Sequence, residues 1–212
     1  MIGCAFIAGA LDVAKRLTVR VGVERWIRYE ADVAKLAIPV PGAALTVFDD
    51  AMVARLRGHT DAGQPAFASG LDLWARGLRG GYVWLDEGEP LCSQWLFTER
   101  DNAALRMLPE WGSMYPPLPP GVGQVEKLWT FSTQRRRGVA SQFAQLMFCE
   151  AQRLGLGSLR THIHEGNAAA RMWAQRTGWN PFGTIVRYEF DFPGIRSLGC
   201  ATCVHTSGSV PA

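Results

Sequence analysis

An expected strand, a tight basic loop and an expected helix follow one another between residues 124 and 154, and this order constrains the fold more than any other feature. Gln124–Phe131 is apolar and aromatic enough for a strand, and Val139–Leu154 carries apolar residues at helical spacing. The loop between them contains Arg135–Arg137 and then Gly138. A helix start exposes N–H groups and the positive end of the helix dipole, so this junction predicts a phosphate site.

Two features of the loop favour the binding of a phosphate. Gly138 lets the main chain approach an anion closely, and the arginines supply charge-assisted hydrogen bonds. Ser141 adds a hydroxyl in the first helical turn, either for a phosphate or as an ordinary helix-start serine. The spacing matches neither G-x-x-x-x-G-K-[ST] nor G-x-G-x-x-G, so neither of those nucleotide motifs is predicted.

The loop resembles the R-x-x-G-x-A signature of the GNAT acyltransferase superfamily through Arg135, Gly138 and Ala140. The segments that follow resemble the same family in the same order. A strand at Leu159–His164 precedes Asn167, which opens a second helix, and Gly178-Trp179 stands where the family has a glycine and an aromatic residue.

This resemblance implies an α/β fold built on a GNAT-like central mixed sheet. The first part of the sheet is expected to be antiparallel, with a hairpin of Tyr82–Leu85 and Leu91–Thr98. A parallel pair of strands, splayed apart and flanked by helices, is expected to follow. Residues 1–70 would form the acceptor side of this domain, residues 71–193 the acyl-CoA-binding core and residues 194–212 a loose tail.

The resemblance also implies acetyl-CoA, or another acyl-CoA, as co-substrate. The loop would hold its diphosphate, and its pantetheine arm would pair with the main chain of the splayed strand and contact the asparagine. The coenzyme-binding residues expected on this basis are Leu128, Trp129, Thr130, Arg135, Arg136, Arg137, Gly138, Val139, Ala140, Ser141 and Asn167.

Two residues are candidates for the base that takes the proton of an attacking amine. Glu126 lies on the strand before the loop and, by period-two alternation, on the same face as Leu128 and Thr130. His162 precedes Asn167 by five residues, where some GNAT relatives carry a catalytic carboxylate, and a neutral imidazole accepts a proton near neutral pH. The alternatives are a strand carboxylate paired with an arginine and a structural histidine.

The general acid is where the chain departs from the family pattern. Many GNAT proteins place a tyrosine seven residues after the asparagine to protonate the leaving thiolate, and this chain has Ala174 there. Tyr188 is a candidate substitute if its side chain points inward. Otherwise the thiolate would leave through water, or the chain would not catalyse this reaction.

Composition limits the compartment and the ligand class. The chain has a formal net charge of +3, but residues 127–187 hold nine basic residues against Glu150 and Glu165, a net charge of +7 that suits several phosphates. The five cysteines form an odd, scattered set, so we expect the cytoplasm. No apolar run reaches the roughly 18 residues of a membrane span. Cys200, Cys203 and His205 lack a fourth ligand nearby, so no metal is expected.

Several functions fit these observations. The first is an N-acyltransferase that moves an acetyl or other acyl group from acyl-CoA to a small-molecule or protein amine by direct attack. The second is a long-chain N-acyltransferase supplied by an acyl carrier protein, and the third is a non-catalytic CoA-binding module. Nucleic-acid binding fits less well, because Arg135–Arg137 is short and lacks interleaved aromatic residues. The sequence leaves open whether the chain forms a homodimer.

Overall fold

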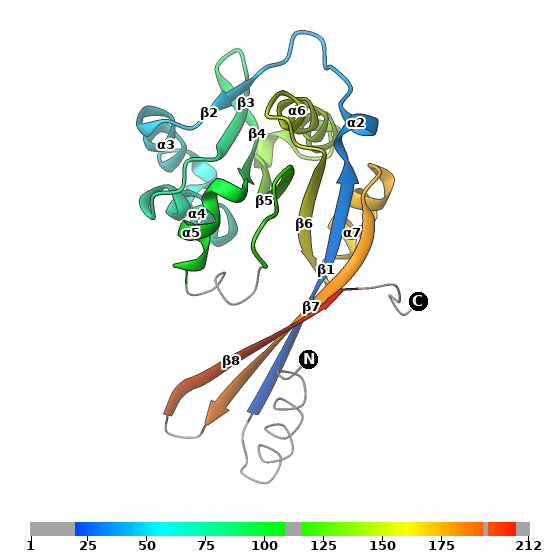
Figure 1. The fold of residues 1–212 in the computed structure, drawn as a ribbon. Coiled ribbons are helices and arrows are strands. Elements are labelled where there is room, and N and C mark those ends of the chain that lie inside the picture. Colours follow the sequence, from blue (N-terminus) through cyan, green and yellow to red (C-terminus); the bar gives the residue numbers. More distant parts are fainter. Residues whose placement is uncertain (1–19, 109–115, 193–194, 207–212) are drawn as a thin grey trace. The chain divides into compact units, whose positions relative to one another are not determined.

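The computed structural model describes residues 20–108, 116–192 and 195–206 (Figure 1). Its strands form an eight-stranded sheet in the order β2-β3-β4-β5-β6-β1-β7-β8. The strands are β1 (Arg20–Asp32), β2 (Leu45–Val47), β3 (Gly81–Asp86), β4 (Glu89–Phe97), β5 (Val122–Thr130), β6 (Ser158–His164), β7 (Asn180–Phe192) and β8 (Ile195–Thr206). The helices are α2 (Val33–Leu36), α3 (Asp50–Arg57), α4 (Pro65–Ala75), α5 (Asn102–Arg106), α6 (Val139–Arg153) and α7 (Ala168–Arg176), with short 3-10 turns η1 (Thr60–Gly63), η2 (Glu99–Asp101) and η3 (Ser132–Gln134).

The chain divides into two compact units. One consists of residues 30–105 and 117–161, and the other of residues 1–29, 106–116 and 162–212. Strands β1 and β6 each contribute residues to both units. The division of the domain at residues 70 and 193 stays a prediction.

The first of these units has the mixed sheet that the sequence predicts. Strands β2, β3, β4 and β5 pair antiparallel with their neighbours, and β5 then pairs parallel with β6. Helix α6 connects β5 to β6, as a parallel pair requires. The predicted fold class, an α/β mixed sheet with helices on it, is therefore confirmed.

Different helices cover the two faces of the antiparallel strands. Tyr82 and Gly81 are neighbours in β3 and so point to opposite faces. The Tyr82 hydroxyl donates to Glu150 of α6 at 3.0 Å. Gly81 pairs with Trp95, whose indole nitrogen would lie 3.7 Å from a Cβ atom at Gly70 of α4. The strands are thus packed between α6 on one face and α4 on the other.

Helix α6 forms because its apolar residues recur on one side. Phe143, Met147 and Ala151 are spaced four residues apart and are almost completely buried. Burying a side chain such as Phe143 contributes about 1.5–3 kcal/mol. The helix ends at Arg153, and Gly155, just beyond its C-cap Leu154, has a φ of +75° that a glycine adopts without strain.

The second unit contains an antiparallel ladder where the sequence predicts a loose tail. Strand β8 pairs with β7 in a register that runs from Gly183 opposite Thr206 to Phe192 opposite Ile195. The structure thus has a paired strand at Ile195–Thr206, within the segment expected to be a loose tail, because a β-ladder is formed by main-chain groups that small and polar residues also carry.

Candidate functional site

The loop between β5 and α6 contains two left-handed residues. Arg136 has a φ of +65°, and Gly138, the N-cap of α6, has a φ of +77°. A Cβ atom at Gly138 would meet nothing within 4 Å, so the glycine is required by the backbone angle rather than by space. The backbone therefore turns sharply into the helix at this point.

The turn leaves a row of main-chain N–H groups open. In the described part of the chain, the N–H groups of Arg136–Ala140 make no hydrogen bond. The N–H groups of Ser141 and Gln142 donate to the carbonyl of Gly138 at 3.0 and 3.3 Å. The open row thus lies at the positive end of the α6 dipole, where an anion is favoured, and the main-chain N–H of Ser141 is not part of it.

Three adjacent arginines, Arg135–Arg137, belong to this loop, and their side chains are exposed. Arg135 donates from Nε to the carbonyl of Thr130 at 3.2 Å, and its guanidinium lies 4.8 Å from the centre of the Trp129 ring. Arg137 donates to Gln134 at 2.6 Å. The contacts of Arg135 and Arg137 keep both positive charges close to the loop.

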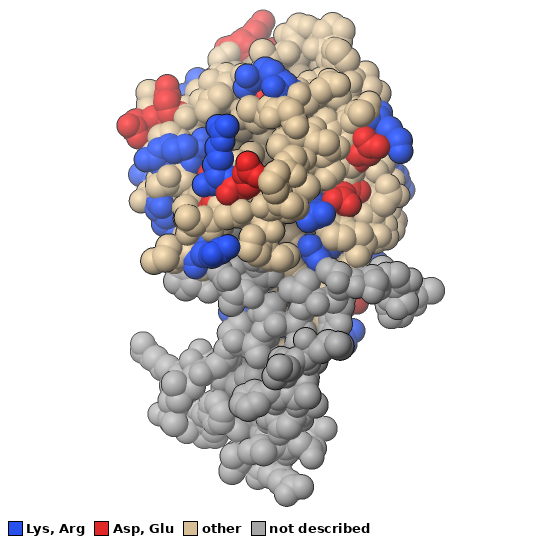
Figure 2. Space-filling model, in the orientation of Figure 1, with Lys and Arg blue, Asp and Glu red and all other residues tan. Residues whose placement is uncertain are grey.

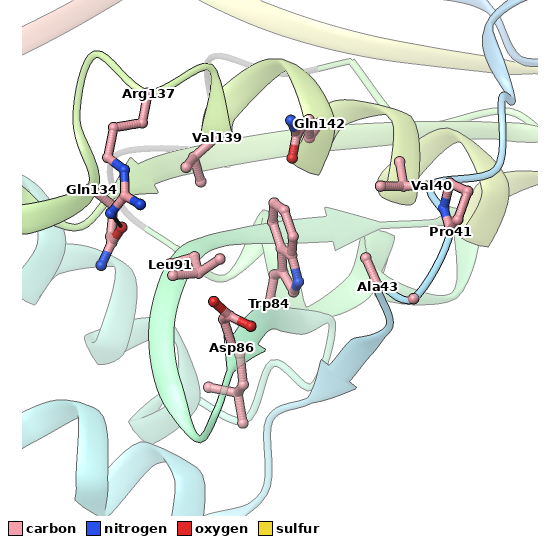
Figure 3. A pocket seen from close by; sticks show the side chains of 12 residues that line it. Val40, Pro41, Ala43, Trp84, Asp86, Leu91, Gln134, Arg137, Val139 and Gln142 are labelled. Atoms are coloured by element: carbon pink, nitrogen blue, oxygen red, sulfur yellow. Dashed lines mark hydrogen bonds between the residues drawn. The ribbon is translucent and has the colours of Figure 1, made fainter.

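A cavity of about 420 Å³ lies beside the start of α6. Arg137, Val139 and Gln142 line it from the loop and the helix, and Trp84 of β3 points toward Val139 and Gln142 from the opposite wall (Figure 3). Such a volume is within the range of small-molecule sites. Two of the predicted coenzyme-binding residues, Arg137 and Val139, therefore border a space of ligand size.

Strand β5 carries a β-bulge next to Glu126. Glu126 is opposite Trp95 and Trp129 is opposite Ser93, so β5 has one residue more than β4 over this stretch. Lys127, within the bulge, has a φ of +58°, which is uncommon for a residue with a side chain. The bulge interrupts the regular alternation of side chains along β5.

The bulge changes which residues share a face with Glu126. Ser93 and Trp95 are two residues apart in β4, so their partners Trp129 and Glu126 lie on one face. Thr130 is opposite Cys92, and its hydroxyl lies 3.6 Å from the Cys92 sulfur, on the other face. The expectation that Glu126 shares a face with Leu128 and Thr130 is therefore wrong.

Glu126 itself is buried, with 8% of its surface exposed. Its Oε1 atom accepts a hydrogen bond of 2.9 Å from the Gln124 side chain. A buried carboxylate on the α4 face of the strand that leads into the loop has the chemistry of a base, and its catalytic role stays a prediction.

The parallel ladder between β5 and β6 is short. It pairs Val122 with Ser158 at one end and Gln124 with Arg160 at the other. Strand β5 runs six residues beyond this ladder, and its partner along that stretch is β4. This is the arrangement expected of a splayed pair; the contact of the Leu128–Thr130 main chain with a pantetheine arm stays a prediction.

A buried carboxylate that the sequence did not single out lies beneath the loop. Asp61 of η1 is 4% exposed. Its Oδ2 atom accepts from the Trp129 indole at 2.9 Å and from the Ser132 main chain at 2.8 Å, and its Oδ1 atom accepts from the Ser132 hydroxyl at 2.7 Å. Asp61 thus ties η1 to the end of β5 and the start of the loop.

Because Asp61 carries a charge, the stability that these hydrogen bonds contribute depends on pH. Burial alone would raise the pKa of the Asp61 carboxyl, but hydrogen bonds from Ser132 and Trp129, with nearby His59, hold that pKa below its ordinary value of 3.8. A lowered folded-state pKa adds stability above the unfolded value, and this stability is lost as the pH falls through the folded one. We expect Asp61→Asn to lower the free energy of unfolding by about 2 kcal/mol at pH 7. In urea titrations, the difference between the two proteins should shrink below a pH of about 4; an undiminished difference at pH 3 would contradict this account.

Comparisons with solved structures identify the architecture, whereas no protein-family model and no curated protein matches the sequence. A protein assigned to the GNAT acetyltransferase family from Novosphingobium aromaticivorans superposes with a TM-score of 0.56 at 18% identity, over 81% of this chain and 66% of that one. The chain has the GNAT fold.

A GCN5-related glucosamine N-acetyltransferase region in a fungal multi-domain GH3 β-N-acetylglucosaminidase gives a TM-score of 0.61 at 11% identity, over 84% of this chain and 22% of that one. A GCN5-related N-acetyltransferase from Sphaerobacter thermophilus gives 0.56 at 13%, over 89% and 58%. The chain thus spans less than two thirds of each of these GNAT-fold proteins.

The remaining residues predicted from the GNAT pattern belong to the other compact unit. Asn167 is the N-cap of α7, and its side-chain oxygen accepts from the Ala170 main chain at 3.1 Å. His162 is buried in β6. The capping role of Asn167 is confirmed, whereas its contact with a coenzyme and the catalytic role of His162 stay predictions.

The place of the family's tyrosine is closed to solvent. Ala174 is completely buried in α7, and its carbonyl accepts from the Trp179 main chain at 3.0 Å. Tyr188 is half-buried in β7. Ala174 therefore offers no side-chain proton donor at this position.

Three further features of the described residues bear on function: the distribution of charge, the grouping of metal-ligating side chains and the presence of membrane-spanning helices. On the face drawn in Figure 2, basic and acidic side chains are interspersed rather than gathered into one basic patch. The described residues include no group of three or more metal-ligating side chains and no helix long and apolar enough to cross a membrane. Strand β8 includes Cys200 and Cys203, and their side chains lie outside the described part of the structure.

Proposed function

We propose that the chain is an N-acyltransferase that moves an acyl group, most simply acetyl, from an acyl-CoA to an amine. The observation that carries this proposal is the open row of N–H groups at Arg136–Ala140, at the positive end of α6 and in a loop that carries three exposed arginines. A diphosphate needs both donors and positive charge, and this loop supplies both. The GNAT fold adds acyl transfer as the reaction class, by analogy of fold.

The reaction requires a base and a place for the leaving thiolate. The amine attacks the thioester carbonyl in its neutral form, the new carbon–nitrogen bond replaces the carbon–sulfur bond, and the amine proton passes to a base. Glu126 is our candidate for that base, since it is a buried carboxylate on the strand that enters the phosphate loop. His162 is the alternative, and water would protonate the thiolate because Ala174 supplies no acid.

A non-catalytic CoA-binding module is a second candidate. The observation that favours it is the complete burial of Ala174 where many GNAT proteins carry a tyrosine. A third candidate is an enzyme that takes a long acyl chain from an acyl carrier protein in place of the acetyl group of acetyl-CoA. The acceptor is either a small-molecule amine or a protein amine.

Two measurements separate these candidates. Isothermal titration with CoA and acetyl-CoA tests the loop, and absence of binding to either would contradict both the acyl-CoA enzyme and the CoA-binding module. Thiol release across a panel of amines then tests catalysis. Binding without thiol release from any amine would favour the module, and release only from an acylated carrier protein would favour the long-chain enzyme.

The loop can be tested by substitution. We expect Arg136→Ala combined with Gly138→Ala to raise the dissociation constant of CoA at least about tenfold, or 1.4 kcal/mol. The first change removes a charge and the second strains the left-handed turn that directs the open N–H groups. Gly155→Ala is the matched control, because Gly155 has a φ of +75° and open space at the other end of α6. An unchanged dissociation constant in the double variant would contradict phosphate binding at this loop.

A further inference from the structure

Asp61 lies below the phosphate loop without belonging to it. Its carboxylate accepts three hydrogen bonds, from the Trp129 indole and from the main chain and hydroxyl of Ser132. The partners lie 68 and 71 residues away in sequence, at the end of β5 and the beginning of η3. Asp61 therefore fixes the point at which the chain enters the loop.

Trp129 links this carboxylate to Arg135. Its ring stacks on Phe67 of α4, with centroids 5.5 Å apart, and the guanidinium of Arg135 lies 4.8 Å from its centre. The Trp129 indole N–H donates a hydrogen bond to Asp61, and this bond fixes the orientation of the ring that faces the Arg135 guanidinium. The Nε atom of Arg135 is committed to the Thr130 carbonyl at 3.2 Å. In the described residues its two Nη groups make no hydrogen bond, so they are available to an anion.

The carboxylate is suited to a permanent structural charge. Three donors compensate for its burial and hold the pKa of Asp61 below the ordinary value, so it stays ionised at physiological pH. A negative charge would repel a phosphate, so Asp61 is not suited to touching the ligand itself. Asp61 can therefore affect anion binding only indirectly, by fixing the positions of Trp129 and Ser132, which donate hydrogen bonds to it.

We infer that Asp61 is a positioning residue that, through Trp129 and Ser132, aims Arg135 and the start of the loop at the diphosphate of the coenzyme. This inference rests on the proposed function for its ligand. It adds that segment η1, on the acceptor side of the expected domain, sets the geometry of the donor loop.

A double-mutant cycle tests the inference. Asp61→Asn removes the negative charge that strengthens these hydrogen bonds, and it leaves one amide oxygen for three donors that now share two carboxylate oxygens. We expect Asp61→Asn and Arg135→Ala each to raise the dissociation constants of CoA and of inorganic pyrophosphate about tenfold, and the double variant to raise them no further. Two independent effects would instead multiply to about a hundredfold and would overturn the inference.

Two further variants separate positioning from general destabilisation. Asp49→Ala removes the N-cap of α3, where Asp49 accepts from the Met52 main chain at 2.7 Å, and it leaves the loop untouched. We expect it to lower the free energy of unfolding with CoA affinity unchanged; an equal loss of affinity would overturn the inference. Trp129→Phe removes the indole N–H and keeps a ring, and it replaces Asp61→Asn if that variant does not fold.

A readout without ligand distinguishes failure of this inference from failure of the proposed function. The Nε–H signal of Arg135 in NMR spectra reports its orientation whether or not CoA binds. A changed Arg135 signal in Asp61→Asn, with no CoA or pyrophosphate binding to the wild type, would leave the positioning role and contradict the proposed function. An unchanged signal and unchanged affinities in a folded Asp61→Asn would overturn the inference alone.

Discussion

Glu126→Gln is expected to lower kcat for acyl transfer by about a hundredfold, the lower end of the range for loss of a general base. The substitution removes the proton acceptor and keeps the shape of the side chain. It also keeps an oxygen for the hydrogen bond of 2.9 Å from the Gln124 side chain, so the free energy of unfolding should change little. Stopped-flow or steady-state thiol release with the best amine of the panel measures kcat, and the KM for acetyl-CoA should stay within about twofold.

The control and the competing assignment use two other variants. Glu99→Gln changes an exposed carboxylate in η2 of the same unit and should leave kcat unchanged. His162→Asn tests the alternative base. If Glu126→Gln retains full turnover and His162→Asn loses it, the base is His162. If both retain it, neither residue is the base.

The turn from β5 into α6 could be predicted from the sequence because its signals are local. Helical spacing after Val139, a glycine at the helix start and three adjacent arginines lie within a few residues of one another. The structure confirms that Gly138 caps α6 with a positive φ. The sequence does not show which N–H groups of the first turn stay open, because the bond of the Ser141 N–H to the Gly138 carbonyl depends on the fold of the loop.

The bulge and the Asp61 contacts could not be predicted in the same way. A lysine at φ +58° has no sequence signal, because the bulge at Lys127 depends on the pairing between β5 and β4. Asp61 lies in a polar segment that matches no motif. Its structural role depends on hydrogen bonds from Trp129 and Ser132, which come close to it only in the folded protein. Strand β8 was missed for a related reason, since its ladder with β7 is formed by main-chain groups that every sequence carries.

Gly80→Ala is expected to lower the free energy of unfolding by about 3 kcal/mol or more, through a clash that the sheet cannot relieve. A Cβ atom at Gly80 would lie 2.0 Å from the carbonyl oxygen of Leu96. The Leu96 N–H also donates to the Gly80 carbonyl at 2.8 Å, and Leu96 is held in β4 opposite Val125 of β5. Moving Leu96 away would therefore break pairing on both sides of β4, the strand that supports Glu126 and the entry to the loop.

Gly63→Ala is the matched substitution for this test, because a Cβ atom at Gly63 meets nothing within 4 Å and its φ is not in the left-handed region. It should change the free energy of unfolding by no more than about 0.5 kcal/mol. Urea unfolding followed by tryptophan fluorescence measures both variants under one condition. Equal stability of the two variants would mean that the main chain at Gly80 does not approach Leu96 of β4 as closely as the structure has it.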